Sequence, residues 1–173
     1  MILGIDIDDT ITDTSGTVKK YLKKDYPDYD HYKLLPKREC KRFLKKYIKQ
    51  MRWEYQLKDG VKEAWQFFLE NHFKIIIITA RNQEFYKDNM KDTVQFLKDH
   101  GIVYDKIYFK QKKKGKMAYK EHVDLFIDDK ESVLDHVSKY GIECLCIGKS
   151  NRYLSFDNWY QIIDYIKEVY HGK

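Results

Sequence analysis

The sequence predicts an α/β protein in which a parallel five-stranded sheet lies between two layers of helices, a three-layer, Rossmann-like arrangement. Short apolar runs of strand character alternate along the chain with segments of helical period, which is the pattern of a parallel sheet covered on both faces. One long segment after the first strand has no strand candidate and predicts a small α-helical insert. A chain of 173 residues, 43% of them hydrophobic, can bury the core of one domain plus such an insert.

The five predicted strands are short runs of aliphatic and aromatic residues bounded by polar or turn residues. Their sequences are ILGIDI near the start of the chain, FKIIIIT at 73–79, KIYF at 106–109, DLFID at 124–128 and ECLCIG at 143–148. Helical period is found in VKEAWQFFLENH, EFYKDNMKDTVQFLKDHG, ESVLDHVSKYG and FDNWYQIIDYIKEVY. Gly101 and Gly141 stand where helices are expected to end.

The domain prediction divides the chain into a core and a cap. We expect residues 1–13 and 59–173 to form the core, and residues 14–58 to form a helical cap inserted after the first strand. The insert contains both prolines of the chain and two helical stretches separated by a tyrosine-rich turn. We expect it to fold over the end of the first strand.

Charge and cysteine content narrow the class of protein. The net charge of +6 fits either a solvated basic surface or attraction of an anionic ligand. The three cysteines Cys40, Cys144 and Cys146 form neither a disulfide framework nor a zinc pattern. No long apolar run and no signal-peptide pattern is present, so we expect no membrane association and a cytoplasmic location.

Acidic and hydroxyl side chains stand at the ends of three predicted strands, and a lysine-rich segment lies between the third and fourth. They are Asp6, Asp8 and Asp9 after the first strand, Thr79 after the second, Asp128 and Asp129 after the fourth, and KQKKKGK at 110–116. The carboxyl ends of parallel strands meet at one edge of the sheet, so these side chains are expected to lie together. Clustered carboxylates repel each other and lose hydration, which indicates that a cation compensates them. The sequence therefore predicts a Mg²⁺-dependent phosphoryl-transfer site.

The residue types suggest individual roles. Mg²⁺ prefers hard oxygen ligands, and Asp6, Asp8 and Asp128 are the predicted metal-binding residues. Asp6 is also the predicted nucleophile, and Asp8 the predicted general acid and base, its proton held by the like charge of its neighbours. Thr79 offers a hydroxyl to a phosphate oxygen, while a lysine neutralises the charge on the transferred group.

This ordered set resembles the haloacid dehalogenase (HAD) superfamily of phosphatases. Its first motif, DxDxT, matches Asp6 to Thr10; its second matches IIIITAR with Thr79, and its fourth matches LFIDD with Asp128. The segments LKDGVKEAWQFFLENHFKIIIITAR, LFIDDK and NWYQII are similar to the 5'(3')-deoxyribonucleotidase group and its bacterial relatives. The resemblance covers nearly the whole chain. It implies a HAD-like fold, a cap between the first and second motifs, Mg²⁺ as cofactor and an aspartyl-phosphate intermediate.

The phosphate-binding lysine of the third motif is assigned to Lys116, which begins a short helix directly before the fourth strand. Four other lysines remain alternatives, namely Lys112, Lys113, Lys114 and Lys91. Asp129 is either a metal ligand or a helix cap. Arg81 either steers phosphate or pairs with a surface acid. In the insert, Tyr26, Tyr29, Tyr32 and Trp53 are candidates for contact with a nucleobase or for simple packing.

The leading functional hypothesis is a hydrolase of phosphoric monoesters that acts on nucleoside monophosphates. One alternative keeps the chemistry but takes a sugar phosphate or the 3'-phosphate of a polynucleotide as substrate. Another class is a non-catalytic phospho-acceptor or a nucleic-acid-binding module. We expect a small nucleotide substrate and no stable nucleic-acid partner. Base preference, 5' versus 3' preference and homo-oligomerisation stay open.

Overall fold

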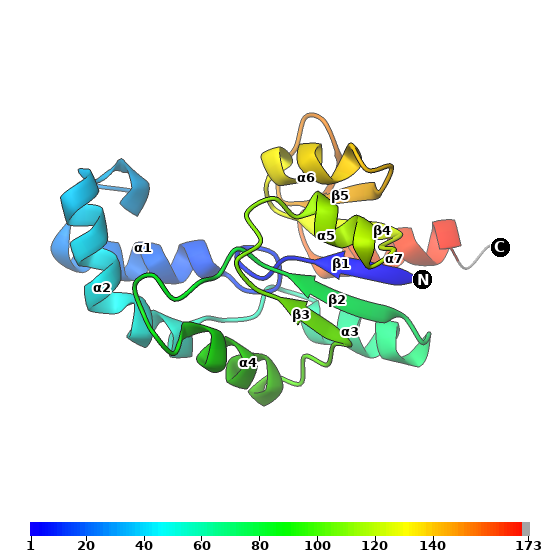
Figure 1. Ribbon diagram of the computed structural model, residues 1–173, viewed down its shortest axis with the longest axis horizontal. Coiled ribbons are helices and arrows are strands. Elements are labelled where there is room, and N and C mark those ends of the chain that lie inside the picture. Colours follow the sequence, from blue (N-terminus) through cyan, green and yellow to red (C-terminus); the bar gives the residue numbers. More distant parts are fainter. Residues whose placement is uncertain (171–173) are drawn as a thin grey trace.

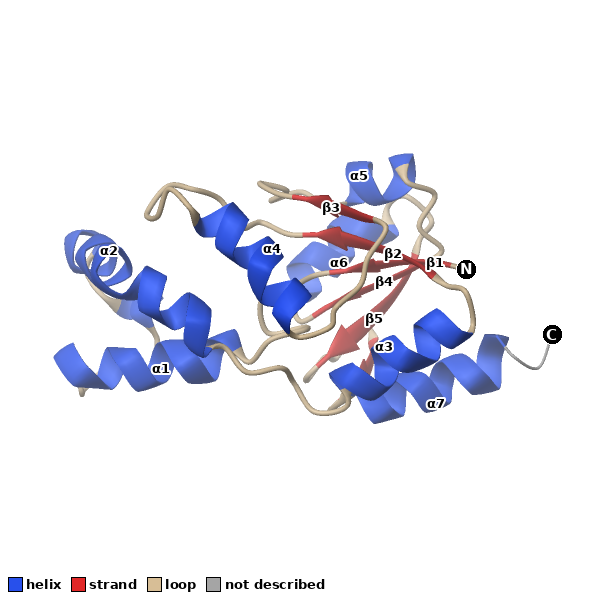
Figure 2. Cartoon of the chain, turned by 90° about the horizontal axis from the view of Figure 1, so that it is seen from below, coloured by secondary structure: helices blue, strands red, loops and turns tan. Residues whose placement is uncertain are grey.

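Six parallel strands form a single sheet in the computed structural model, which describes residues 1–170 (Figure 2). The strands are β1 (Ile2–Ile5), β2 (Lys74–Ile78), β3 (Lys106–Tyr108), β4 (Leu125–Asp128), β5 (Glu143–Ile147) and β6 (Leu154–Phe156), in the spatial order β3-β2-β1-β4-β5-β6. The predicted α/β fold with a parallel sheet is confirmed, but the number of five strands is wrong. β6 has only three residues and forms the edge of the sheet, with Leu154 exposed, so it lacks the apolar run of a buried strand.

Helices cover both faces of this sheet (Figures 1 and 2). Buried side chains of α3 (Val61–Glu70), α4 (Asn89–Asp99) and α7 (Trp159–Tyr170) join the hydrophobic cluster of one face. Those of α5 (Gly115–Lys120) and α6 (Glu131–Ser138) join the cluster of the other. The predicted core includes residues 171–173, which lie outside the described residues.

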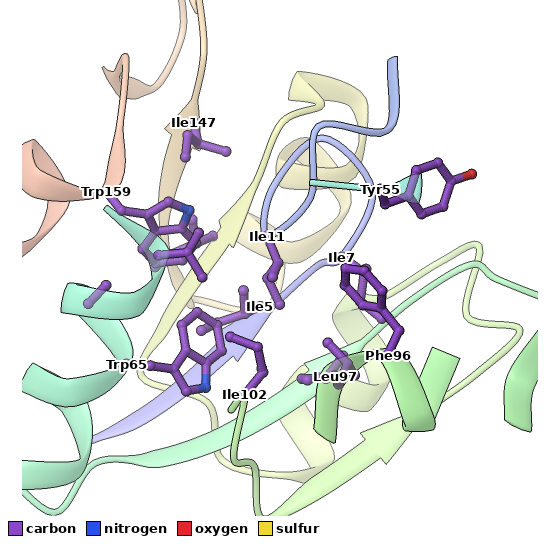
Figure 3. Close-up of a cluster of buried hydrophobic side chains, with 14 of the residues drawn as sticks. Ile5, Ile7, Ile11, Tyr55, Trp65, Phe96, Leu97, Ile102, Ile147 and Trp159 are labelled. Atoms are coloured by element: carbon purple, nitrogen blue, oxygen red, sulfur yellow. The ribbon is translucent and has the colours of Figure 1, made fainter. Parts of the chain in front are cut away.

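Side-chain alternation along the strands produces these two clusters. Leu3 and Ile5 of β1 face the larger cluster, where Trp65 of α3 and Trp159 of α7 meet with ring centroids 5.6 Å apart (Figure 3). Gly4, between them, faces the other side, against Phe126 of β4. The absence of a side chain at Gly4 lets the Phe126 ring pack directly on the β1 backbone.

The chain between β1 and α3 is helical. It contains α1 (Thr14–Asp25), the short 3₁₀ helix η1 (Tyr32–Leu34) and α2 (Lys37–Glu54). Asp13 caps α1 by accepting a hydrogen bond from the Gly16 N–H. In α2, Phe43, Tyr47 and Met51 recur every four residues, so one face of an otherwise basic helix is buried.

The tyrosine-rich turn of the insert packs mainly on α2. The rings of Tyr26 and Tyr32 lie 6.4 and 6.3 Å from that of Phe43, and Tyr29 lies 6.4 Å from Tyr26. Trp53 is exposed on the surface of α2. Within residues 1–170, no helix is long and apolar enough to span a membrane.

Replacement of Gly4 by Ala tests the close packing of β1 against β4. An added Cβ would lie 2.4 Å from Phe126 Cδ2, a contact that a buried ring cannot relieve without displacement. We expect Gly4→Ala to lower the free energy of unfolding by about 1–3 kcal/mol in urea titrations. The double variant Gly4→Ala/Phe126→Leu should lose less unfolding free energy than the sum of the losses of the two single variants. Equal stability of Gly4→Ala and wild type would contradict this packing.

Candidate active site

The ends of β1, β2 and β4 bring the predicted site residues to one edge of the sheet. The register pairs Ile5 of β1 with both Ile77 of β2 and Ile127 of β4. Asp6 therefore continues β1 beside Asp128, the last residue of β4, and its N–H donates to the Ile127 carbonyl over 3.1 Å. Asp6 and Asp128 are both buried.

A single lysine lies between these two acids. The Nζ atom of Lys114 is 2.7 Å from Asp6 Oδ1 and 2.6 Å from Asp128 Oδ2, and only 3% of its side chain is exposed. The second oxygen of Asp128 accepts from the Lys130 N–H at 2.9 Å. Asp6 and Asp128 thus share one cation in a site closed to water.

The structure does not place the predicted Lys116 in this cluster. Lys116 is exposed on α5, whereas Lys114 immediately precedes that helix and points to the strand ends. Gly115 allows Lys114 to lie there. A Cβ at Gly115 would lie 2.5 Å from the His136 carbonyl oxygen, so the missing side chain lets the start of α5 pack closely on α6. Lys112, Lys113 and Lys91 are exposed as well. The lysine beside the acids is therefore Lys114, one of the alternatives, and not Lys116; which lysine contacts a phosphate stays a prediction.

Three carboxylates at this edge of the sheet could hold a divalent cation. Oxygen atoms of Asp6, Asp128 and Asp129 lie within 4.8 Å of one another. Burial raises the pKa of all three groups, that of Asp6 to about 6. The opposing charges, Lys114 beside Asp6 and Asp128 and Lys130 beside Asp129, are too small to offset the loss of hydration. A hard divalent cation would supply the missing positive charge, so the oxygen donors present suit Mg²⁺. Asp129 belongs to this group and the carboxylate of Asp8 does not.

Asp8 faces away from the three acids and is held by Arg81. Arg81 Nη2 donates to Asp8 Oδ1 over 2.7 Å, and Nε lies 3.1 and 3.2 Å from the two oxygens. The Thr14 hydroxyl donates to Oδ1 as well, over 2.9 Å. Burial favours the neutral acid, but Arg81 and Arg52 outweigh it and hold the pKa of Asp8 far below its ordinary value. The expectation that neighbouring acids hold a proton on Asp8 is therefore wrong for the protein without substrate.

Thr79 is fully buried at the end of β2. Its N–H donates to the Tyr108 carbonyl at 2.9 Å, and its hydroxyl oxygen accepts from the Arg81 N–H at 3.2 Å. Thr79 thus helps fix the turn that carries Arg81. Its contact with a phosphate stays a prediction.

Arg81 and Arg52 are parts of the site whose roles the sequence does not reveal. Both guanidinium groups lie over the Tyr55 ring, with their central carbons 5.3 and 5.1 Å from its centroid. Arg81 is buried and also donates to the Thr93 hydroxyl over 3.2 Å. The sequence already made Arg81 a candidate, as a phosphate-steering residue or the partner of a surface acid, and the structure pairs it with the half-buried Asp8 in the site. Arg52 was missed, because it is one of many basic residues in α2.

A cavity of about 560 Å³ opens beside these residues. Its walls come from α1, η1 and α2 on one side and from the loops after β1, β2 and β4 on the other. Among its lining residues are Asp8, Asp9, Thr14, Tyr32, Arg52, Tyr55, Arg81, Phe85, Asn89, Asp129 and Lys130. Asp9 turns the chain into α1, because its carboxylate accepts from the N–H and hydroxyl of Ser15 over 2.7 and 2.6 Å.

Comparison with solved structures identifies the fold. A predicted phosphatase from Clostridium acetobutylicum is 14% identical, with a TM-score of 0.71 over 97% of this chain and 98% of that one. A haloacid dehalogenase-like hydrolase from Streptococcus pneumoniae is 14% identical, with a TM-score of 0.69 over 95% and 97%. A predicted phosphoglycolate phosphatase from Haemophilus somnus is 15% identical, with a TM-score of 0.67 over 95% and 96%.

The protein therefore has the fold of the haloacid dehalogenase-like hydrolases. No family model matches the sequence, and no curated protein matches it either. The descriptions of the three structures above name hydrolase and phosphatase activities. None of the three names a nucleotidase.

The raised pKa of Asp6 leads to an expected pH dependence of stability. A folded pKa of about 6, against an ordinary value of 3.8, means that protons bind the folded state more tightly than the unfolded one. The stability contributed by Asp6 is complete below about pH 4 and is lost as the pH rises through about 6. Metal-free wild type should lose more unfolding free energy than Asp6→Asn between pH 4 and 7.5, by on the order of 2 kcal/mol.

Chemical denaturation of both proteins across this range, in a chelating buffer, measures the difference. Saturating Mg²⁺ should reduce the loss in the wild type, because a bound cation favours the ionised carboxylate. If the free energy of unfolding changes equally with pH in the two metal-free proteins, folding does not raise the pKa of Asp6.

Proposed function

We propose that the protein is a Mg²⁺-dependent phosphomonoesterase that hydrolyses nucleoside monophosphates through an aspartyl phosphate on Asp6. The observation that carries this proposal is the pair Asp6 and Asp128, bridged by Lys114 at the ends of adjacent strands, with Asp8 two residues after Asp6 and held by Arg81. The likeness in fold to phosphatases of the haloacid dehalogenase type supports it.

The proposed reaction has two displacements at phosphorus. In the first, a carboxylate oxygen of Asp6 forms a bond to phosphorus, the bond to the leaving oxygen breaks, and Asp8 gives that oxygen a proton. In the second, a water oxygen forms a bond to phosphorus and gives a proton to Asp8, while the bond between phosphorus and the Asp6 oxygen breaks, which releases inorganic phosphate and restores the Asp6 carboxylate. Bound Mg²⁺ would supply positive charge beside the transferred group and keep Asp6 ionised. Lys114 neutralises part of the charge on the equatorial oxygens.

Asp8 must gain a proton before the first displacement, although Arg81 holds it ionised in the protein without substrate. A phosphate dianion beside Arg81 would compete for its N–H groups and weaken its hold on Asp8. The pKa of Asp8 would then rise, because its main cationic partner is shared. Substrate binding thus prepares the proton donor.

The nucleotide assignment rests on the size and lining of the cavity. A volume of about 560 Å³ lies within the range of small-ligand sites, roughly 300–1,000 Å³. Tyr32, Tyr55 and Phe85 give it an aromatic wall on which a nucleobase could stack. Residues 14–58 would act as the cap that excludes water and longer nucleic acids. The unbridged cysteines fit a cytoplasmic enzyme, and the oligomeric state stays open.

A small phosphorylated acid or sugar is the second candidate substrate. It is favoured by the cationic side of the cavity, where Arg52 and Lys130 lie. The likeness in fold to the structure from Haemophilus somnus described as a predicted phosphoglycolate phosphatase points the same way. A substrate panel in the presence of Mg²⁺ separates the two candidates.

Asp6→Asn tests the proposed nucleophile. The amide has nearly the same shape as the carboxylate but cannot form the aspartyl phosphate, so kcat should fall by at least about 10³-fold. Hydrolysis of deoxyribonucleoside monophosphates with Mg²⁺, followed by phosphate release, measures it. Asp164→Asn, an exposed change on α7, is the matched control and should keep wild-type activity. Turnover by Asp6→Asn near the wild-type rate would rule out this mechanism.

Two lysine variants test whether Lys114 or Lys116 binds the phosphate group of the substrate. Lys114→Met removes the charge between Asp6 and Asp128, and we expect kcat/KM to fall by about 100-fold or more. Lys116→Met, two residues further on, removes an exposed charge and should change kcat/KM by less than about 2-fold. Thermal unfolding with Mg²⁺ shows whether each variant is folded. The reverse order of effects would restore Lys116 as the phosphate-binding lysine.

A further inference from the structure

Positive charge is concentrated in the helical insert. Of the 33 lysines and arginines of the chain, 14 lie in residues 14–58, against 5 of its 27 aspartates and glutamates. The rest of the chain therefore has a small excess of acids, and the basic balance of the protein comes from the insert. In Figures 1 and 2, α1 and α2 extend beyond the sheet at one end of the molecule, so this charge lies on a projecting part of the surface.

The exposed face of α2 carries cations in pairs that recur every four residues. All of α2 is described, and no acid is exposed on it, because Glu39 and Glu54 are half-buried and accept hydrogen bonds from tyrosine hydroxyls. The exposed cations are Lys37, Arg38, Lys41, Arg42, Lys45, Lys46 and Lys49.

Most of these charges are not neutralised by acids of the protein. Arg42 pairs with Glu39 over 3.2 Å, and Lys46 pairs with Asp25 over 2.7 Å. Within residues 1–170, the other five cations of this face form no salt bridge. On α1, by contrast, three of the exposed lysines are paired with acids. Five unpaired cations on one helix face repel one another, and a bound polyanion would relieve this repulsion.

An exposed indole lies at the end of this row of cations. Trp53 is 49% exposed, and it is the only large hydrophobic side chain that is exposed on α2. Lys49 precedes it by four residues, so the two side chains are neighbours on the helix surface. Trp53 does not line the cavity of the candidate active site. Its ring is therefore placed to meet a ligand that lies outside the cavity.

The rest of α2 decides which class of polyanion suits this face. A helix that lies on a lipid surface turns its apolar face toward the lipids, but in α2 that face packs inside the protein, where Leu44, Ile48 and Met51 line the cavity. A duplex keeps its bases stacked inside, out of reach of Trp53. A single strand presents phosphates to the cations and free bases to the indole.

We propose that the exposed face of α2 is a docking surface for single-stranded nucleic acid, with its cations on the phosphates and Trp53 stacked on a base. This inference goes beyond the proposed function, because the strand lies outside the cavity and is not hydrolysed there. Lys37 and Trp53 are about 24 Å apart along the helix axis, so the surface holds several nucleotides. We expect a Kd on the order of 10⁻⁴–10⁻⁶ M at physiological salt, which agrees with the absence of a stable nucleic-acid partner.

The salt dependence of binding tests the role of the cations. Fluorescence anisotropy of a labelled oligodeoxythymidylate of about 12 nucleotides measures Kd over a range of salt concentrations, without Mg²⁺. For five phosphate contacts, the slope of log Kobs against log salt should be about −3.5. Lys41→Gln/Lys45→Gln/Lys49→Gln should bind at least about 10-fold more weakly at low salt and should reduce the slope by about 2.

A second triple variant is the matched control. Lys62→Gln/Lys98→Gln/Lys120→Gln removes three exposed lysines of α3, α4 and α5 and lowers the net charge equally. It should leave Kd within about 3-fold of the wild-type value and the slope unchanged. Equal weakening by the two triple variants would show that net charge alone attracts the strand, which would overturn the assignment to α2.

Tryptophan fluorescence tests the stacking. Trp65 and Trp159 are only 2% and 0% exposed, so quenching by a bound strand reports on Trp53. Trp53→Leu should abolish the quenching and weaken binding by about 5- to 100-fold. Trp53→Tyr, which keeps an aromatic ring, should lose less affinity. Quenching that persists in Trp53→Leu would contradict the stacking.

Two further ligands separate the classes of partner. The duplex formed with the complementary strand should not quench Trp53, and vesicles of phosphatidylcholine and phosphatidylserine should bind more weakly than the single strand. Equal quenching by strand and duplex, or binding to the vesicles alone, would overturn the proposal. None of these measurements requires catalysis. An active enzyme that does not bind the strand would therefore reject this inference alone, and a strand-binding protein without phosphatase activity would reject only the proposed function.

Discussion

The contact of Lys114 with Asp6 and Asp128 is the interaction on which the rest of the site depends. Adjacent parallel strands end at the same edge of the sheet, so β1 and β4 necessarily bring their terminal carboxylates together. Away from water, two such charges cannot coexist without compensation. Asp129 adds a third carboxylate, which Lys130 Nζ approaches to 3.2 Å, so two ammonium groups compensate only part of the charge of three acids. The remaining deficit is the negative charge that a bound cation would offset in the proposed mechanism.

Charge is divided differently on the other side of the loop after β1. There the cations exceed the acids, since Arg81 and Arg52 both approach Asp8. The acidic group around Asp6 suits a metal ion, and the basic group around Asp8 suits an anionic substrate. The two groups are only two residues apart in sequence. Side chains two residues apart on an extended strand would point to the same side. Here β1 ends at Ile5 and the chain turns at Asp9, where φ is 58°, so Asp6 and Asp8 are not held on one strand face.

The segment above the strand ends is connected to the site by charged contacts rather than by apolar packing alone. Arg52 of α2 donates to Asn89 at the start of α4, and Thr14 at the start of α1 donates to Asp8. These hydrogen bonds join residues on opposite walls of the cavity, so a shift of α1 or α2 would change the surroundings of Asp8, the proposed proton donor.

The parallel sheet and the meeting of Asp6 with Asp128 could be predicted from the sequence, because strand ends follow directly from apolar runs. β6 could not, because an edge strand of three residues has no such run. Lys114 could not be distinguished from Lys116, since the choice depends on where Gly115 lets α5 approach α6. The ion pair of Asp8 with Arg81 and the approach of Arg52 to Asp8 depend on side-chain packing between segments distant in sequence, which periodicity does not encode.

A crystal structure with Mn²⁺ in place of Mg²⁺ and a phosphate analogue is the most direct test of the central claim. The account predicts one anomalous peak at about 2.0–2.3 Å from carboxylate oxygens of Asp6 and Asp128, with the analogue in contact with Lys114. A peak at another part of the surface, with Lys114 still bound to both acids and no anion beside them, would contradict it.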